Sequence, residues 1–347
     1  MPPLFNPRLV NDPAGDPGLF VPFFYEKRAL LLDAGDLSAL SPRDILKITH
    51  VFITHMHMDH FIGFDRILRI CLGRNKVLHA FGPEGFIEKM AARLSAYTWN
   101  LVENYQNPLR ITATEIRGNE LASCIFDCSS RFVPKDFATQ DLQSRTIHTE
   151  SSFSVEAAIL DHDIACMGFA IKERFSVNIR KEVLQDMGLV PGPWLYAFKQ
   201  ALYAESDPES LFEIPVQYAP ESAQTRFSLR ELTDRLAMVT KGHKIAYITD
   251  AAGHEQNMEK MIDLAMDADH LFIEAAFLEE DRDLARRKKH LTAAAAGRIA
   301  ARAGAKRFTL FHFSPRYPGK RDRIEHEART AWNTSGTKDA FNRFPSR

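Results

Sequence analysis

Residues 54–60 of this chain read Thr54-His55-Met56-His57-Met58-Asp59-His60. The apolar, β-branched residues 49–53 before them predict a buried strand, and residues 61–70 after them predict a helix that ends near Gly73. Three imidazoles and a carboxylate therefore occupy a strand-to-helix turn, where core packing does not require them. Imidazole nitrogen and carboxylate oxygen are ligands of Zn²⁺ and similar divalent ions. The stretch predicts a metal site, and the alternative is histidines that merely cluster on a loop.

Composition sets broad limits on the protein. The chain has 347 residues, 45% of them hydrophobic and 26% charged, with a formal net charge of −1. This charge excludes a global field that recruits nucleic acid or anionic membrane, so a nucleic-acid substrate would need a local basic patch. The four cysteines lack CxxC spacing and are expected to be buried thiols. We see neither a signal peptide nor an apolar stretch of roughly 20 residues, and we expect a cytoplasmic protein without membrane contact.

Predicted strands and helices alternate along the chain, which indicates a mixed α/β architecture. We expect one domain over residues 1–347, with residues 193–242 forming a divergent arm or insertion. That segment lacks glycine from 193 to 241, and between 201 and 240 it carries seven acidic residues against three arginines. Ser228 and Glu231 have the spacing of a capping box within it. The role of the acidic stretch does not follow from the sequence.

Three ionisable residues outside the motif share one sequence context. His162 lies in a turn between two apolar runs, Asp250 ends the strand predicted at 244–249, and His312 ends the strand predicted at 307–311. One such residue alone is usually structural. Together with the histidine motif, the three favour a binuclear site, in which a bridging carboxylate serves both ions and each ion takes further imidazoles.

At these residues the chain resembles the metallo-β-lactamase superfamily and, within it, the ribonuclease Z-like proteins. The resemblance covers roughly residues 28–330. Several stretches beyond the first motif carry it: Leu160-Asp161-His162 followed by Gly168-Phe169, Gly188-Leu189-Val190-Pro191-Gly192-Pro193, Ile273-Glu274-Ala275-Ala276-Phe277, His290-Leu291-Thr292-Ala293 and Phe311-His312-Phe313-Ser314-Pro315-Arg316-Tyr317.

The resemblance implies a fold and a set of metal ligands. The fold would be an αβ/βα four-layer sandwich, with the metals at one edge between two sheets. Two Zn²⁺ ions are implied, with Mn²⁺ or Fe²⁺ as alternatives. One ion would be held by His55, His57 and His162. The other would be held by Asp59, His60 and His312, and Asp250 would bridge the two.

The same resemblance implies hydrolysis of a phosphodiester by a metal-bridging hydroxide. Asp59 would orient the water or accept its proton, and His290 would protonate the leaving oxygen while Glu274 holds its other nitrogen. The alternative for His290 is a surface histidine after a basic helix end. Ser314 and Arg316 are candidates for contacts to a substrate phosphate, although Arg316 has the alternative of a solvated surface charge.

The substrate remains open between two classes. A ribonuclease Z acts on tRNA precursors and usually grips them with a glycine-rich basic arm, whereas the corresponding region here is acidic and would repel phosphate. Arg286, Arg287, Lys288, Lys289, Lys320, Arg321 and Arg323 are basic residues that could replace the arm. The alternative is a hydrolase of a small substrate, such as a cyclic nucleotide, another phosphodiester, a sulfate ester or a lactone. A non-enzymatic metal-binding scaffold is disfavoured by the full ligand set, and a homodimer is implied by family analogy.

Overall fold

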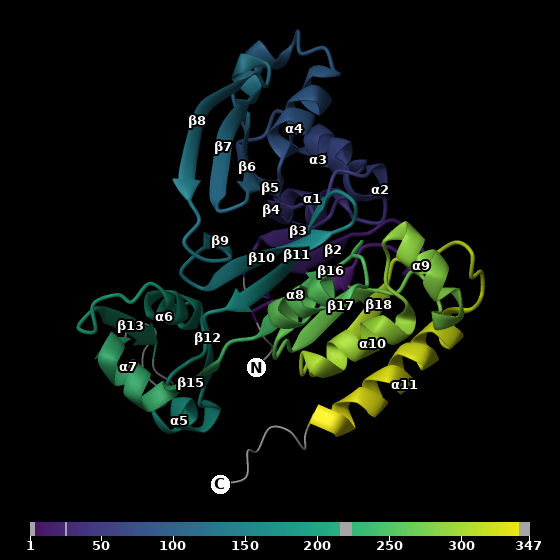
Figure 1. Ribbon diagram of the computed structural model, residues 1–347. Helices are drawn as coiled ribbons and strands as arrows, with labels where there is room; N and C mark the ends of the chain where they lie inside the picture. The colour runs from purple at the N-terminus through teal and green to yellow at the C-terminus, as the bar shows by residue number, and fades with distance from the viewer. Residues whose placement is uncertain (1–3, 25, 216–223, 340–347) are drawn as a thin grey trace. The chain divides into compact units, whose positions relative to one another are not determined.

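The computed structural model describes residues 4–24, 26–215 and 224–339. They form two compact units (Figure 1), and each is described by itself. Within the described residues, the larger unit takes in Phe5–Ile147, Val155–Ile171 and Lys244–Arg347, and the smaller unit takes in Met1–Leu4, His148–Ser154 and Lys172–His243. The segment 193–242, expected to be an arm, falls in the smaller unit, and its residues 216–223 lie outside the described ones.

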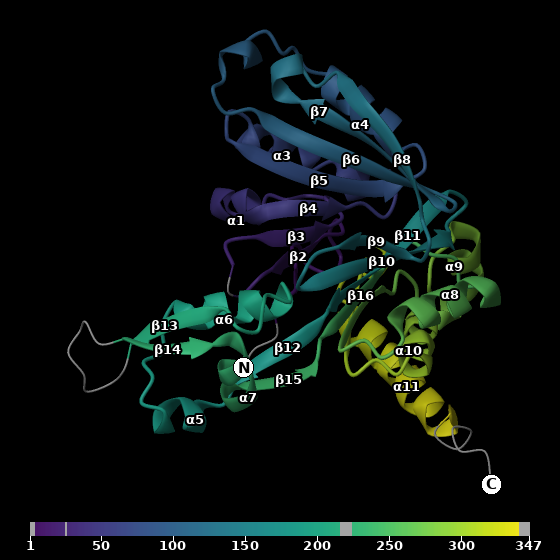
Figure 2. The ribbon, with the colours of Figure 1, turned by 90° about the vertical axis from the view of Figure 1, so that its left-hand side faces the viewer.

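The first sheet of the larger unit has eight strands in the order of the chain, and Figure 2 shows most of them in succession. The strands β3 to β6 run parallel, and their neighbours pair antiparallel. The strands are β1 (Arg8–Leu9), β2 (Leu19–Pro22), β3 (Ala29–Leu32), β4 (Ile48–Phe52), β5 (Lys76–Pro83), β6 (Leu109–Arg117), β7 (Glu120–Asp127) and β8 (Pro134–Asp141). Apolar side chains of α1 (Pro42–Lys47), α3 (Phe64–Cys71) and α4 (Phe86–Ser95) share one hydrophobic core with this sheet.

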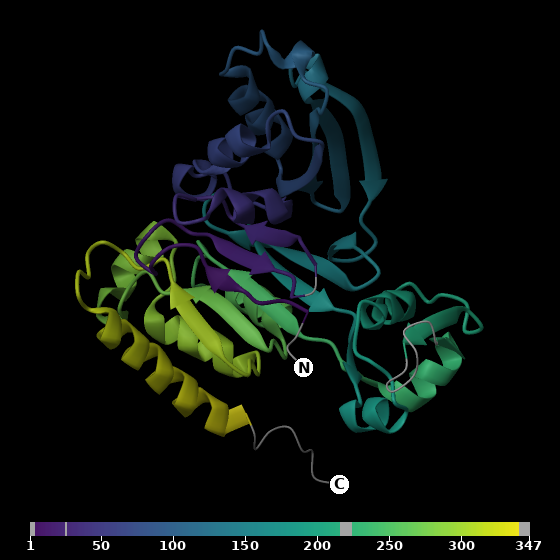
Figure 3. The same ribbon diagram turned by 180° about the vertical axis from the view of Figure 1, so that it is seen from behind.

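The second sheet has the strand order β18-β17-β16-β11-β10-β9. Its strands are β9 (Thr146–Thr149), β10 (Phe153–Asp161), β11 (Ala165–Glu173), β16 (Lys244–Ile248), β17 (His270–Glu274) and β18 (Phe308–Phe311). Strands β16, β17 and β18 are parallel, so their carboxyl ends meet at one edge. A second core joins them to α8 (Glu255–Ala265), α9 (Arg282–Lys288), α10 (Ala293–Arg302) and α11 (Arg321–Asp339). Figure 3 shows α10 and α11, in yellow-green and yellow, side by side.

The two sheets of the larger unit meet through apolar inner faces. The rings of Phe52 on β4 and Phe169 on β11 have centroids 5.5 Å apart. The hydroxyl of Tyr247 on β16 donates a hydrogen bond of 3.1 Å to Asp33, which follows β3. Each sheet thus has helices on its outer side and the other sheet on its inner side. The predicted four-layer αβ/βα sandwich is confirmed.

The smaller unit has its own apolar core, which includes Phe198, Ile214 and Leu232. Two antiparallel strand pairs and three helices enclose it: β12 (Phe175–Ile179) with β15 (Ala237–Lys241), β13 (Leu211–Pro215) with β14 (Gln224–Ser228), α5 (Lys181–Asp186), α6 (Trp194–Tyr203) and α7 (Leu229–Leu236). The predicted capping box is present, because Ser228 and Glu231 exchange hydrogen bonds at the start of α7. The larger unit also contains short helical turns at α2 (Met58–Phe61), η1 (Val102–Asn104), η2 (Cys128–Ser130) and η3 (Glu279–Asp281).

The helix predicted at residues 61–70 differs from the structure, and several strands, β8 among them, have no counterpart in the sequence-based predictions. Ser41 and Thr292 are the N-caps of α1 and α10, and their side chains accept hydrogen bonds from Asp44 N and Ala295 N. The single helix predicted at 61–70 is divided into α2 and α3 at Gly63, whose N–H donates to Ala34 O. Strand β8 was not predicted, because it is an edge strand whose mostly exposed side chains lack apolar alternation.

All four cysteines are buried and unpaired, as predicted. Every helix in residues 4–24, 26–215 and 224–339 is too short or too polar to cross a bilayer.

Gly297 tests the packing of α10 on α11. Alanine is favoured over glycine in a helix by about 1 kcal/mol, but a Cβ at Gly297 would lie 2.0 Å from the carbonyl oxygen of Ala328. Because this neighbour is backbone, we expect overpacking to outweigh propensity, so that Gly297→Ala lowers the free energy of unfolding by about 2 kcal/mol in urea titrations. A Cβ at Gly253 would make an ordinary 3.5 Å contact, so Gly253→Ala is the control and should change stability little. A Gly297→Ala protein more stable than wild type would contradict this packing.

Candidate metal centre

The predicted ligands come from segments that end strands of both sheets in the larger unit. The motif loop with His55 follows β4, and His162 lies in the turn between β10 and β11. Asp250 follows β16 and His312 follows β18. The carboxyl ends of parallel strands meet at one edge of a sheet, so ligands distant in sequence arrive at one place.

The first ligand group contains His55, His57, His162 and Asp250. One ligand atom from each lies within 4.8 Å of those of the others. The Nε2 atoms of His55 and His162 are each 3.5 Å from Asp250 Oδ2. This group contains the three imidazoles assigned to one ion and the carboxylate assigned as the bridge.

The second group contains Asp59, His60 and His312, again with ligand atoms within 4.8 Å of one another. Asp59 Oδ2 is 3.6 Å from the Nε2 atoms of both His60 and His312. Asp250 also reaches this group, since its Oδ2 is 3.5 Å from His60 Nε2 and its Oδ1 is 3.0 Å from His312 Nδ1. The structure therefore brings together all seven predicted ligands, and Asp250 lies between the two groups.

The donor atoms fit divalent metal ions better than a hydrogen-bond network. His55 Nε2, His60 Nε2 and His312 Nδ1 are buried and make no well-oriented hydrogen bond with the described residues, although His312 Nδ1 lies 3.0 Å from Asp250 Oδ1. Buried polar atoms in proteins are normally paired. The 3.5 Å separations from Asp250 are too long for good hydrogen bonds. Two ligands about 2.1 Å from one tetrahedral ion would lie roughly 3.4 Å apart. The set of imidazoles and carboxylates suits Zn²⁺, Mn²⁺ or Fe²⁺.

A residue missed in the sequence, Asp33, supports the second group. Its buried carboxylate, which follows β3, accepts hydrogen bonds from Thr54 N at 2.7 Å, from His60 Nδ1 at 2.9 Å and from Tyr247 Oη at 3.1 Å. His162 is fixed similarly, with Nδ1 2.9 Å from the carbonyl oxygen of Lys289. Such contacts hold the ring and leave Nε2 free for a metal ion. The available signal was a carboxylate that ends an apolar strand, which is also the context of Asp250.

Buried neighbours shift the pKa values of the ligand side chains in opposite directions. Burial and the neighbouring His60 lower the pKa of His55 to about 2. Burial disfavours the charged form of His60, but Asp33 and Asp250 outweigh this and raise its pKa to about 10. For Asp59, burial is outweighed by His312 and His60, which lower its pKa to about 2. His55 is thus neutral and Asp59 ionised near neutral pH, as metal ligands require.

Glu274 and His290 form a pair beside the ligands. Glu274 ends β17 and is fully buried, and its Oε2 is 2.9 Å from His290 Nδ1. Its Oε1 accepts hydrogen bonds from the backbone N–H groups of Ala251 and Leu291. Burial lowers the pKa of His290, but the charge of Glu274 outweighs this and raises it. The centroid of the His290 ring lies 5.0 Å from that of His162, so this imidazole, whose charged form Glu274 stabilises, adjoins the metal ligands.

The two residues predicted to contact a substrate phosphate, Ser314 and Arg316, interact with neighbouring residues of the protein. The Ser314 N–H donates to Ala276 O, and Ser314 Oγ accepts a 3.3 Å hydrogen bond from the Arg316 N–H. Arg316 Nε lies 3.4 Å from Asp281 Oδ2, and its side chain is 56% exposed. A role of Ser314 and Arg316 in phosphate binding stays a prediction.

Asp33 is expected to set metal affinity without being a ligand. Asp33→Asn keeps the shape of the side chain but removes the charge that holds His60, so we expect metal affinity to fall about 10–100-fold in chelator competition. Asp36→Asn is the matched control, because Asp36 is an exposed carboxylate three residues away that bonds Ser38. Equal affinities in the two variants would show that Asp33 does not act on the metal centre.

The raised pKa values predict how zinc affinity depends on pH. Asp33 and Asp250 keep His60 protonated at neutral pH, and carboxylates led by Asp250 outweigh burial and raise the pKa of His312. A metal ion must displace these protons, so affinity should rise from about pH 6 to about pH 8, beyond the usual histidine pKa of roughly 6.5. Calorimetric zinc titrations in buffers of different ionisation enthalpy would count the released protons. An affinity that levels off near pH 7 would contradict the raised pKa of His60.

Comparisons with known proteins agree with this geometry. A model of the beta-lactamase superfamily domain matches residues 212–313. The ribonuclease Z of Deinococcus radiodurans is 31% identical over 292 residues, which cover 83% of either chain. The ribonuclease Z of Bacillus velezensis is 26% identical over 89% of this chain and 86% of its own. Among solved structures, the metallo-beta-lactamase fold protein YhfI of Bacillus subtilis has the same fold, with a TM-score of 0.52 and 15% identity over 92% of this chain and 86% of its own. The chain belongs to the ribonuclease Z family of the metallo-β-lactamase superfamily.

Proposed function

We propose that this protein is a metal-dependent phosphodiesterase that processes the 3′ ends of tRNA precursors. One observation carries the proposal: seven imidazole and carboxylate side chains converge in a chain that belongs to the ribonuclease Z family. The small-substrate alternative is not favoured, because relatives that match most of the chain are named ribonuclease Z. It remains an outcome of the test below.

We propose Zn²⁺ as the metal at both ligand groups. His55, His57 and His162 would hold one ion, Asp59, His60 and His312 the other, and Asp250 would be shared. When bound, the two ions supply positive charge that polarises phosphoryl oxygens and makes water more acidic. Elemental analysis of purified protein distinguishes zinc from manganese and iron.

The protein's own residues have separate tasks in this mechanism. Glu274 holds the proton on His290 Nδ1, which leaves the Nε2 proton of the imidazolium for the leaving oxygen of the cleaved ester. Asp59 is ionised and partly exposed, so its carboxylate orients the attacking water and accepts its proton. Acid and base thus come from different segments, and their environments move their pKa values apart.

The acidic segment limits how RNA binds. We propose that residues 193–242 are the counterpart of the family's arm, in a form that does not grip phosphates. The described part of this segment pairs some of its arginines internally, for example Arg226 with Glu213 and Arg230 with Glu209. Its surplus of carboxylates repels RNA at physiological salt. Affinity for RNA must then depend on cations near the metal centre.

The role of His290 is tested by His290→Gln. Removal of the proton donor should lower kcat for a tRNA precursor about 10²–10⁴-fold while metal content stays unchanged. His326→Gln is the control, because His326 is an exposed histidine on α11. Loss of metal together with activity would instead assign His290 to the ligand set.

The proposed function is tested by substrate choice. Zinc-loaded protein should cleave a tRNA precursor with a 3′ trailer and hydrolyse a bis-aryl phosphodiester, and His60→Ala should abolish both because a ligand of one ion is lost. Turnover of a cyclic nucleotide, a sulfate ester or a lactone without cleavage of the precursor would replace the proposed function with the small-substrate alternative. Unchanged turnover by metal-assayed His60→Ala would refute the metal mechanism.

We further propose that the protein is a homodimer, on the basis of family resemblance alone. Light scattering of the purified protein gives its mass in solution and tests this directly.

A further inference from the structure

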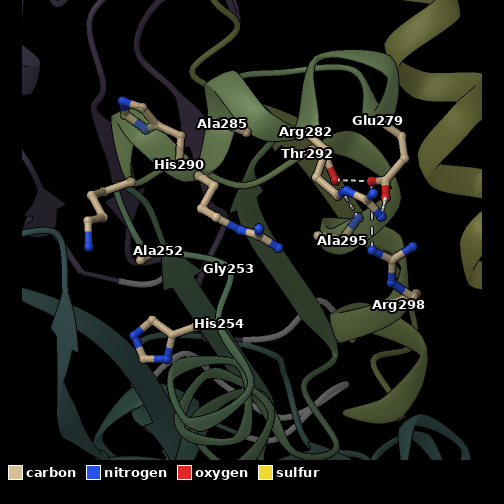
Figure 4. Close-up of a pocket in the computed structure, with 12 residues that line it drawn as sticks. Ala252, Gly253, His254, Glu279, Arg282, Ala285, His290, Thr292, Ala295 and Arg298 are labelled. Carbon is tan, nitrogen blue, oxygen red and sulfur yellow. Dashed lines mark hydrogen bonds and ion pairs between the residues drawn. The ribbon is translucent and has the colours of Figure 1, made fainter.

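A cavity of about 220 Å³ lies in the larger unit beside His290. Its wall consists of residues after β16, residues of η3, α9 and α10, and residues of the connection between α9 and α10. In the view of Figure 4, His290 lies on one side, and Glu279 with Arg282 and Arg298 lies on the other. The volume is below that of a pocket for a drug-sized ligand, and it suits a phosphate group with part of a sugar.

The cavity is lined by four cationic side chains, Arg282, Arg286, Lys289 and Arg298, and by the single carboxylate of Glu279. Glu279 is shared, because it lies 3.7 Å from both Arg282 and Arg298 and accepts a hydrogen bond from Thr292. The lining therefore has an excess of positive charge. Such a lining selects an anion.

Arg286 is the cation most available to a ligand. Lys289 is 3.0 Å from the exposed Asp163. Arg286 is exposed and has no acidic partner among residues 4–24, 26–215 and 224–339. A guanidinium offers several donors in a plane and matches the oxygens of a phosphate.

The cavity adjoins the metal centre through one side chain. His290 lines the cavity, and its ring lies 5.0 Å from the ring of His162 and 5.5 Å from the ring of His312. A ligand that places one phosphate at the metal ligands can therefore place a neighbouring anionic group on the far side of His290.

We infer that this cavity is a subsite for the phosphate next to the scissile one, with Arg286 as its principal contact. The inference rests on the proposed phosphodiesterase and adds a binding place for a second phosphate of its polynucleotide substrate, which a simple diester with one phosphate could not fill. Two arginines nearer the carboxyl end do not offer the same charge, since Arg321 pairs with Glu325 and Arg323 pairs with Glu280. Arg287 is exposed on the same helix but does not line the cavity.

The experiment compares ligands that a phosphodiesterase cannot cleave. Calorimetry would give the affinities of the zinc-loaded protein for adenosine 3′,5′-bisphosphate and for adenosine 5′-monophosphate. The wild type should bind the bisphosphate more tightly. Arg286→Gln should reduce the ratio of the two affinities about three- to fivefold, as expected for an exposed charge contact. Arg287→Gln removes the same charge from the next position and should leave the ratio unchanged.

Each outcome decides the inference. A ratio that falls equally in both variants would reflect general electrostatics and overturn the subsite, and so would a ratio that neither variant changes. Because binding needs no turnover, the two proposals fail separately. A protein that binds the bisphosphate through Arg286 but leaves a tRNA precursor intact keeps the subsite and loses the proposed function, and cleavage without a ratio change does the reverse.

Discussion

The buried carboxylate of Asp33 joins the two sheets to the metal centre. It accepts hydrogen bonds from the backbone and hydroxyl of Thr54, from His60 and from Tyr247. These donors fill the roughly four lone-pair positions of an ionised carboxylate. A buried carboxylate with fewer partners would destabilise the fold. The position of His60 therefore depends on the packing of the two sheets against each other, and metal binding depends on the fold as a whole.

The strands that deliver these groups end in an unusual backbone conformation. Asp33, Asp250 and His312 follow β3, β16 and β18, and each has a positive φ, of 55°, 50° and 60°. This region costs an L-residue roughly 1–2 kcal/mol and persists only where the surroundings enforce it. Here each side chain is held by the cluster it belongs to. The turn directs a side chain from the strand end toward the metal centre, so the local strain is a consequence of the site.

The sequence points to the candidate ligands more clearly than to the residues that hold them in place. The histidine motif, and the strand ends at Asp250 and His312, are local signals, because a carboxylate or imidazole after an apolar run is visible in a few residues. The partners of Asp33 are not local, since Tyr247 lies more than 200 positions away and the pair meets only when the sheets pack. The segment 193–242, predicted as a divergent arm or insertion, lies within the longest stretch of the smaller unit, Lys172–His243. Strand β12, near the start of this stretch, is not evident in the sequence because it pairs with β15, some 60 residues later.

Charge in this protein is arranged locally, and this determines how a polyanion can be held. The net charge of −1 gives no long-range attraction, and at physiological salt a charge acts over about 8 Å. Within that range, the charges of the nearest side chains determine whether an anion is attracted or repelled. The charge of many surface arginines is offset by an ion pair with a neighbouring carboxylate, as in the pairs of Arg302 with Glu255 and Glu259. Around the metal centre, the ligand carboxylates are matched by bound cations when the site is loaded, and Arg286 remains uncompensated beside it. An anionic ligand therefore gains its attraction only after it reaches the catalytic edge, so recognition should depend on the few phosphates next to the cleaved bond.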